Sequence, residues 1–211
     1  QDDLPKTDYF AYTIEDGDGD RDTAILKIDV TPSTLFAPLD KDAKVYEEAL
    51  DLSAAGDLVA GTVVGSNPGS AAETDAINQL TATGGAGGYK YELVGSADGS
   101  YGKIQINENG TYTYSLKDPV TTNPAADNGK NVEEGTTEEF TYRVTDADGN
   151  TATGKIQVAI VDDVPDAKDD MDSATEGGTA TGNVFTGDDI NPGGDANATD
   201  GVKDIQGADG A

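Results

Sequence analysis

The sequence predicts an all-β protein made of antiparallel β-sandwich modules in tandem. Three observations support this prediction: short runs that alternate apolar and polar residues, turns rich in Gly, Asn and Asp between them, and a segment that occurs twice. Alternation with a period of two places one face of a strand in a core and the other in solvent. Short strands separated by such turns are typical of a sandwich.

The repeated segment is long and contains no gap. Residues 8–30 read DYFAYTIEDGDGDRDTAILKIDV, and residues 138–160 read EEFTYRVTDADGNTATGKIQVAI, which is an offset of 130. A weaker echo, at an offset of 125, relates residues 74–86 to residues 199–211. A period of this length indicates whole modules along the chain rather than a solenoid of small repeats.

These echoes divide the chain into three parts. Residues 1–32 match the last strands of a preceding module, residues 33–165 form one complete module, and residues 166–211 match the first part of a following module. Pro165 marks the later boundary because it cannot donate to a strand ladder and keeps the preceding residue extended. The two end pieces resemble the two ends of one module, which predicts that they can pair, most simply between neighbouring molecules.

Within the complete module, five strands are expected from the alternating pattern. They cover residues 89–94, 103–106, 111–116, 140–144 and 153–161. Asn-Gly and Asp-Gly turns join the last four into two hairpins. Residues 44–55 are ambiguous, because an acidic, leucine-bearing stretch suits a short helix whereas Val45 and Tyr46 suit a strand. Four tyrosines at strand spacing are expected in the core rather than on a sugar-binding platform: Tyr89, Tyr91, Tyr112 and Tyr114.

Composition restricts the possible functions. The chain has 41 acidic and 13 basic side chains, and its net charge of −28 argues against nucleic acid or an anionic membrane as a partner. It contains no Cys and no His, which excludes disulfides, thiolate sites, the usual zinc sites and histidine-based catalysis. Carboxylate oxygens are abundant and suit Ca²⁺ or Mg²⁺. We expect bound cations to offset the acidic charge when the chain folds, and we find no apolar run long enough for membrane insertion.

The turns of the repeated segment are candidate calcium sites. Asp16, Asp18 and Asp20 place oxygen ligands at alternate positions, with glycines that let a tight loop wrap an ion. This turn is not an EF-hand, since Arg21 occupies the sixth position where that motif requires glycine. The alternative is an ordinary solvated turn. The second copy offers Asp146, Asp148 and Asn150.

The boundary near Pro165 is a further candidate calcium site. Its predicted ligands are Asp162, Asp163 and Asp166, with Glu176 reaching the same ion from the next module. A shared cation would relieve the repulsion among these carboxylates and fix the angle between modules, whereas the alternative is a flexible acidic linker. One more acidic loop carries Asp188, Asp189 and Asp195, again with a simple loop as the alternative.

Three motifs in order resemble one known repeat family. Residues 101–116 resemble the VCBS repeat in having a glycine, an alternating strand, a polar-Gly turn, and Tyr-x-Tyr followed by Leu. Residues 140–150 resemble the next strand and turn of that repeat, and residues 175–185 resemble the opening of another copy. Residues 49–60 insert extra sequence that the second copy lacks. The resemblance implies an immunoglobulin- or cadherin-like antiparallel β-sandwich of a type I-secreted bacterial RTX adhesin, exported unfolded and folded outside the cell by Ca²⁺.

The resemblance implies a structural role. We expect a secreted, extracellular extender module at the bacterial cell surface that spaces a ligand-binding region from the cell and supports adhesion or biofilm formation. Its expected partners are neighbouring modules of the same chain and, through head-to-tail self-association, other copies; a host or biofilm ligand would bind elsewhere in the full protein. We do not expect an enzyme, because among 41 acids pairs of carboxylates suited to glycoside hydrolysis arise by chance. Two alternatives remain open: a glycan- or protein-binding module using loops such as 65–88, and an accessory domain of a secreted polysaccharide-degrading enzyme.

Overall fold

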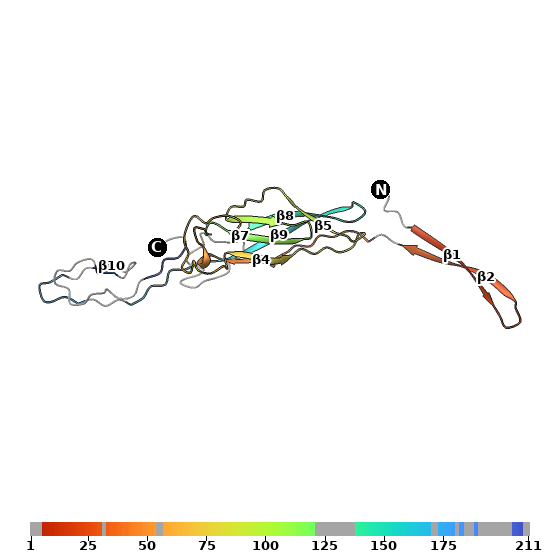
Figure 1. Ribbon diagram of the computed structural model, residues 1–211, viewed down its shortest axis with the longest axis horizontal. Coiled ribbons are helices and arrows are strands. Elements are labelled where there is room, and N and C mark those ends of the chain that lie inside the picture. The colour runs from red at the N-terminus through yellow and green to blue at the C-terminus, as the bar shows by residue number, and fades with distance from the viewer. Residues whose placement is uncertain are drawn as a thin grey trace.

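The structure is a computed structural model that is elongated along one axis. It describes residues 6–30, 33–53, 57–120, 138–169, 173–179, 182–183, 188–189 and 204–208. Figure 1 shows three parts in a row: the β1–β2 hairpin at one end, a β-sandwich in the middle, and the C-terminal strands β10 and β11 beyond the other end of the sandwich.

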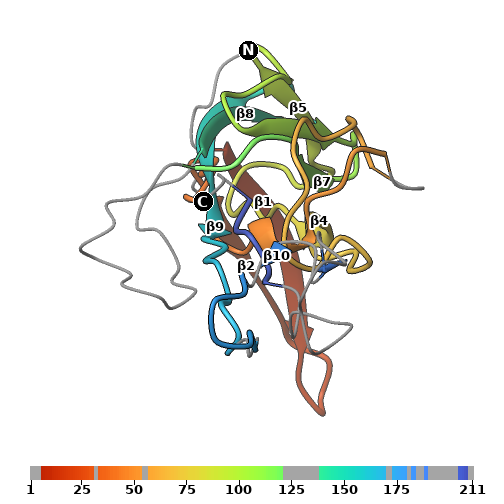
Figure 2. The ribbon, with the colours of Figure 1, turned by 90° about the vertical axis from the view of Figure 1, so that its left-hand side faces the viewer.

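The sandwich contains two facing sheets. One has the order β3 (Lys44–Tyr46), β9 (Thr151–Val161), β8 (Glu138–Thr145) and β5 (Lys90–Val94). The other has the order β4 (Thr74–Gln79), β7 (Thr111–Leu116) and β6 (Gly102–Ile106). Viewed along the long axis, β8 and β9 lie on one side, and β4 and β7 on the other (Figure 2).

The strand order identifies the type of sandwich. Every pair is antiparallel except β3 with β9, so the first strand of the module lies parallel to its last strand. The β8–β9 hairpin with β5 forms one layer and β4, β7 and β6 form the other, as in immunoglobulin-type domains. The prediction of an all-β, immunoglobulin- or cadherin-like antiparallel sandwich is therefore confirmed.

The core lies between the two sheets and follows the predicted alternation. The inward positions of β8 and β9 are buried: Phe140, Tyr142, Val144, Ile156, Val158 and Ile160. They meet buried side chains of the opposite sheet: Ile104, Tyr112, Tyr114 and Leu116. Tyr91 is buried too, with its ring centroid 6.1 Å from that of Tyr142, and Tyr89 packs against the core. The placement of the tyrosines in the core is confirmed.

The five predicted strands are present, and the ambiguous stretch contains both alternatives in short form. Strand β3 is followed directly by a single 3₁₀ turn, Glu47–Ala49. Strand β4 was not predicted, because its sequence TDAINQ is mostly polar and lacks apolar alternation. Its pairing with β7 also shifts register between Asp75 and Asn78, as at a β-bulge.

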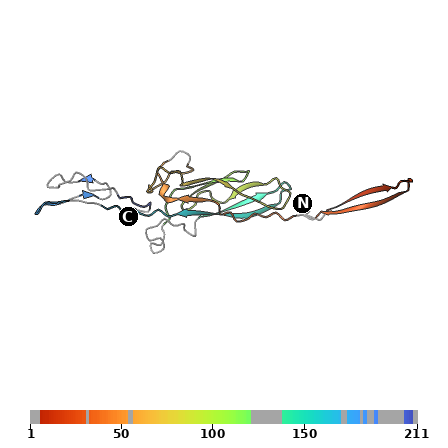
Figure 3. The ribbon, with the colours of Figure 1, turned by 90° about the horizontal axis from the view of Figure 1, so that it is seen from below.

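The repeated segment folds as the same hairpin twice. In the first hairpin, β1 (Lys6–Glu15) pairs with β2 (Arg21–Val30), and Phe10 lies opposite Leu26. In the second hairpin, β8 with β9, the equivalent Phe140 lies opposite Ile156. Figure 3 shows the first hairpin beyond the sandwich, with its turn pointing away from it along the long axis.

The C-terminal segment returns to the end of β9. Asp166 and Ile205 form an antiparallel bridge, and Ala208 joins the core cluster. Further along, β10 (Gly182–Asn183) pairs antiparallel with β11 (Asp188–Asp189).

Candidate cation sites

The turn of the first hairpin gathers three carboxylates. Oδ1 of Asp16 accepts the backbone N–H groups of Asp18 at 3.3 Å and of Asp20 at 3.0 Å. Gly19, with φ of +98°, supplies the left-handed conformation that closes the turn. One carboxylate oxygen from each of the three aspartates lies within 4.8 Å of the others, and all three residues are exposed. The turn can therefore offer three oxygens to one ion, whose other positions carbonyls or water would fill.

The turn of the second hairpin has the same backbone structure. Asp146 donates its N–H to the carbonyl of Asn150 at 3.0 Å, as Asp16 does to Asp20 at 3.0 Å. Its Oδ1 accepts the N–H groups of Asp148 at 3.0 Å and of Asn150 at 2.9 Å. The sequence repeat is thus a repeat of the hydrogen-bonded turn as well as of the strands.

The surroundings of Asp146 differ from those of Asp16. Asp146 is buried, and its Oδ2 accepts the N–H of Ala86 at 2.9 Å and the side-chain amide of Asn150 at 3.1 Å. The hydrogen bond from Ala86 is the main cause that lowers the pKa of Asp146 below its usual value of 3.8. Both oxygens of Asp146 therefore already accept hydrogen bonds from the protein, and the bond from Ala86 holds the glycine-rich loop at 84–88. Asp148, in contrast, is exposed.

This loop lies where the first hairpin joins the sandwich. Gly85 donates its N–H to the carbonyl of Ser33 at 2.7 Å, and Ala147 donates to the carbonyl of Gly87 at 2.8 Å. A Cβ on Gly85 would lie 2.4 Å from Oδ2 of Asp146, so the close approach requires glycine. The second predicted turn site thus faces the junction between the hairpin and the module.

At the opposite end of the sandwich, the first two acids of the module boundary, Asp162 and Asp163, are buried. Asp163 is 2% exposed, and its carboxylate accepts the N–H of Ser66 at 2.8 Å and the hydroxyl of Ser66 at 2.6 Å. Oε2 of Glu47 accepts the N–H of Asp163 at 3.3 Å, while its Oε1 accepts the N–H of Val120 at 2.6 Å. The start of the boundary is therefore held against the sandwich.

The remaining boundary acids are exposed. Asp166 forms an ion pair with Lys168, and Glu176 lies in an exposed turn. Within the ranges that the structure describes, no three of the predicted boundary carboxylates meet within 4.8 Å. The shared site among Asp162, Asp163, Asp166 and Glu176 stays a prediction.

The last predicted site lies mostly outside the described residues. Asp188 and Asp189 form strand β11, and Asp195 belongs to the part of the chain that the structure does not describe. This site also stays a prediction.

Sequence reasoning did not assign a role to Glu47. It is fully buried, and it lies between Val45 and Ala49, which are fully buried too. The signal was available: an acid at an inward position of an alternating stretch must accept hydrogen bonds or be neutralised. Here its two oxygens link the backbone at Val120 to the backbone of Asp163 at the module boundary.

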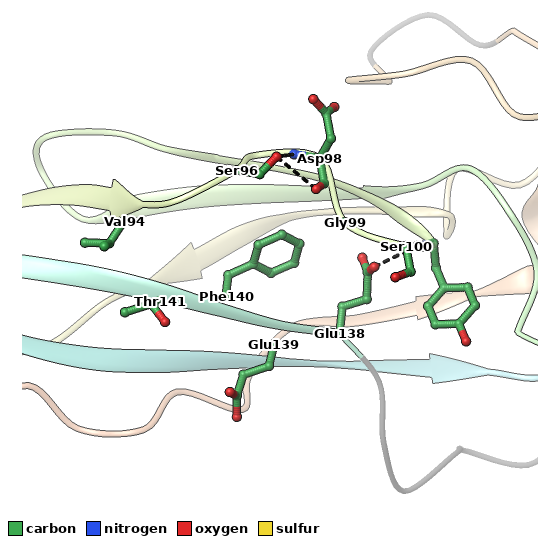
Figure 4. A pocket seen from close by; sticks show the side chains of 10 residues that line it. Val94, Ser96, Asp98, Gly99, Ser100, Glu138, Glu139, Phe140 and Thr141 are labelled. Carbon is green, nitrogen blue, oxygen red and sulfur yellow. Dashed lines mark hydrogen bonds between the residues drawn. The ribbon is translucent and has the colours of Figure 1, made fainter.

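A shallow hollow beside β5 and β8 is lined by three acids, Asp98, Glu138 and Glu139 (Figure 4). Glu138 points toward the 99–101 segment and accepts the N–H of Tyr101 at 2.7 Å and the hydroxyl of Tyr114 at 2.7 Å. Glu139 pairs with Lys155. Asp98 pairs with Lys103, so all three carboxylates have structural partners. That the chain is not an enzyme stays a prediction.

Comparison with known proteins gives little beyond this geometry. No protein-family profile matches the chain, and no curated protein matches it. Among solved structures, it is similar to extracellular cadherin domains 1–5 of protocadherin gamma B2, at 12% identity and a TM-score of 0.32, over 82% of this chain and 35% of that chain. The extracellular domain of protocadherin GammaB4 matches at 12% identity and a TM-score of 0.30, over 78% of this chain and 28% of that chain. Scores at this level carry no argument about function.

The chain spans about a third of the length of those cadherin structures. Within the described residues, no helix has the length and apolar character needed to cross a membrane.

Proposed function

We propose that this chain is a calcium-stabilised extender segment of a large, secreted bacterial surface adhesin. The proposal rests on one observation: the same hairpin occurs twice, as β1–β2 and as β8–β9, and the first copy lies in line with the sandwich (Figure 1). Modules that repeat along one axis produce length, which is what a spacer requires. A spacer does not need the deep pocket with convergent reactive groups that a binding or catalytic protein requires.

Calcium is proposed to give the row of modules its stiffness. The acidic residues exceed the basic ones by 28, and this repulsion favours an expanded chain. A hinge between modules bends less when its carboxylates share an ion than when they repel one another. The three carboxylates of the first turn, exposed at the tip of the β1–β2 hairpin, support this part of the proposal. At an extracellular calcium concentration, a dissociation constant on the order of 10⁻⁴–10⁻³ M suffices.

The first hairpin supplies a reason for modules to associate. The apolar side chains of one of its faces, among them Phe10, Tyr12 and Leu26, are exposed, whereas the equivalent Phe140, Tyr142 and Ile156 of β8–β9 are buried. We propose that residues 1–32 are the last strands of a preceding module and are covered by its other strands. Residues 166–211 of a neighbouring copy can supply such covering strands. Residues 199–211 echo residues 74–86, the segment that includes β4.

Melting curves with and without calcium test the metal part of the proposal. Binding to the native state alone raises its stability, so millimolar Ca²⁺ should raise the melting temperature and EDTA should reverse the rise. The triple variant Asp16→Asn, Asp18→Asn, Asp20→Asn should bind less Ca²⁺. The control for the three lost charges is Glu92→Gln, Glu108→Gln, Glu139→Gln, at exposed carboxylates in surface ion pairs. An unchanged melting curve in EDTA would remove calcium from the proposal.

Small-angle scattering and light scattering test the extender part. We expect a rod-like particle that becomes more flexible in EDTA, and self-association that depends on concentration and disappears when residues 166–211 are removed. A strict monomer in which both ends stay mobile in calcium would contradict head-to-tail pairing.

A further inference from the structure

A buried carboxylate immediately before β4 lacks a partner for one of its oxygens. Glu73 is 1% exposed, and its Oε2 accepts the N–H of Asp51 at 3.0 Å. Its Oε1 is buried without a hydrogen-bond partner, and so is Oδ1 of Asp51. A buried carboxylate normally has its lone pairs satisfied by donors or a cation, because leaving it unpaired is costly. These two unpaired oxygens therefore require a donor or a cation.

A third carboxylate joins these two. One carboxylate oxygen each from Asp51, Asp57 and Glu73 lies within 4.8 Å of the others, and none of the three residues is exposed. Neither Asp51 nor Glu73 forms an ion pair with a lysine or arginine among the described residues. The local charge is thus concentrated and shielded from water, unlike that of the exposed turn at 16–20.

The three side chains are held on a fixed backbone. The carbonyl of Glu73 accepts the N–H of Leu116 at 2.9 Å, which ties it to the end of β7. Thr74 donates its hydroxyl to Oδ1 of Asp57 at 3.0 Å. A Cβ on Gly61 would lie 2.0 Å from the carbonyl oxygen of Asp51, so that loop packs tightly where only glycine fits. The oxygens are therefore positioned before any ligand arrives.

The electrostatics of Glu73 agree with this geometry. Burial, and after it the neighbouring Asp57 carboxylate, together raise the pKa of Glu73 to about 7. Near neutral pH the site holds either a shared proton or a cation. Two carboxylates from an irregular loop and one from the residue before β4 match the oxygen-rich, flexible coordination of Ca²⁺ better than the strict octahedron that Mg²⁺ requires.

We propose that Asp51, Asp57 and Glu73 bind a hard divalent cation, with Ca²⁺ as the preferred ion. The site lies in the complete module and includes two residues of the segment 49–60, the insertion that the second copy lacks. It shares no residue with the hairpin turns or the module boundary, so it stands whether or not the chain is an extender. Its effect is to join the inserted loop to the sandwich through an ion.

The test is calcium binding and melting of Glu73→Gln in the full chain. This substitution keeps the shape of Glu73 and removes its charge, and Glu108→Gln, at an exposed carboxylate paired with Lys90, is the matched control. We expect Glu73→Gln to bind one Ca²⁺ fewer per chain by equilibrium dialysis, and to show a smaller rise in melting temperature on adding Ca²⁺. In EDTA it should melt at the same temperature as the wild type or higher, because a buried unpaired charge is gone.

The rival is a proton shared between Glu73 and Asp57 with no metal. In that case Glu73→Gln and the wild type bind equal amounts of Ca²⁺ and respond to it equally, which would overturn the proposal. Asp57→Asn is the second variant if Glu73→Gln does not fold, with the same loss of one ion expected. If the triple Asp→Asn variant at 16–20 binds as much Ca²⁺ as the wild type while Glu73→Gln binds one ion fewer, the turn site is contradicted and this site is supported.

Discussion

The first and second hairpins are the same local structure in opposite surroundings. Their strands have equal register and their turns have the same backbone hydrogen bonds. Yet Phe10 and Tyr12 are 53% and 52% exposed, whereas the equivalent Phe140 and Tyr142 are 6% and 0% exposed. In the second hairpin β3 and β5 extend the sheet on both sides and a second sheet covers it. In the first hairpin the described strands provide neither.

This difference separates what the local sequence determines from what packing determines. Alternation and an Asp-Gly turn are enough to specify the ladder, since both copies form it. They do not specify stability, because an isolated two-stranded hairpin is marginal in water. The apolar face of the first hairpin therefore contributes to stability only when another sheet covers it.

The largest expected effect comes from removing the same tyrosine in each hairpin. Tyr142→Ala should lower the free energy of unfolding by about 3–5 kcal/mol, because a fully buried ring and its hydroxyl bond to the carbonyl of Pro38 are lost. At a protein concentration low enough to keep the chain monomeric, Tyr12→Ala should change it by less than about 0.5 kcal/mol, because Tyr12 is exposed there. Urea unfolding of both variants measures the difference, and equal losses would mean that the first hairpin is covered in solution.

The next effect concerns the turn aspartates. Asp146→Asn replaces an oxygen that accepts two N–H groups by a donor, so in EDTA the melting temperature should fall on the order of 5 °C. Asp16→Asn alters an exposed turn and should shift it by about 1 °C or less. Calorimetry of the two variants gives the comparison, and a larger loss for Asp16→Asn would contradict the role of Asp146 as the anchor of the glycine loop.

The fold was largely predictable because its signals are local, whereas the sites depend on distant contacts. Strands β5 to β9 and the buried tyrosines follow from alternation. Strand β4 does not, because its pairing with β7 rather than its own sequence defines it. The anchoring role of Asp146 depends on Ala86, and the Glu73 cluster depends on Asp51 and Asp57 of an inserted loop. In both cases the contacting residues are far apart in the sequence.

A smaller effect is expected in acid, and it concerns the buried Asp146 of the second turn. The pKa of Asp146 is lowered in the native state, so its contribution to stability is full above its unfolded value of 3.8 and is lost as the pH falls through the native pKa. The difference in stability between the wild type and Asp146→Asn in EDTA should therefore be constant from neutral pH to about pH 4 and shrink below it. Urea unfolding at several pH values measures this. A difference that grows on acidification would mean that the pKa of Asp146 is raised, not lowered.

The smallest expected effect is at the last pair before each turn. The first hairpin has the ion pair between Arg21 and Glu15 at 2.6 Å, both side chains at least half exposed, where the second hairpin has Thr145 opposite Thr151. Exposed ion pairs contribute little because water screens them and two long side chains lose freedom. Replacing both Glu15 and Arg21 by Thr should therefore change amide hydrogen exchange along β1 and β2 by no more than about twofold, measured by NMR. A much larger increase in exchange would mean that this ion pair, rather than the backbone ladder and its turn, keeps the uncovered hairpin folded. The two hairpins would then be alike in strand pairing but not in what stabilises them.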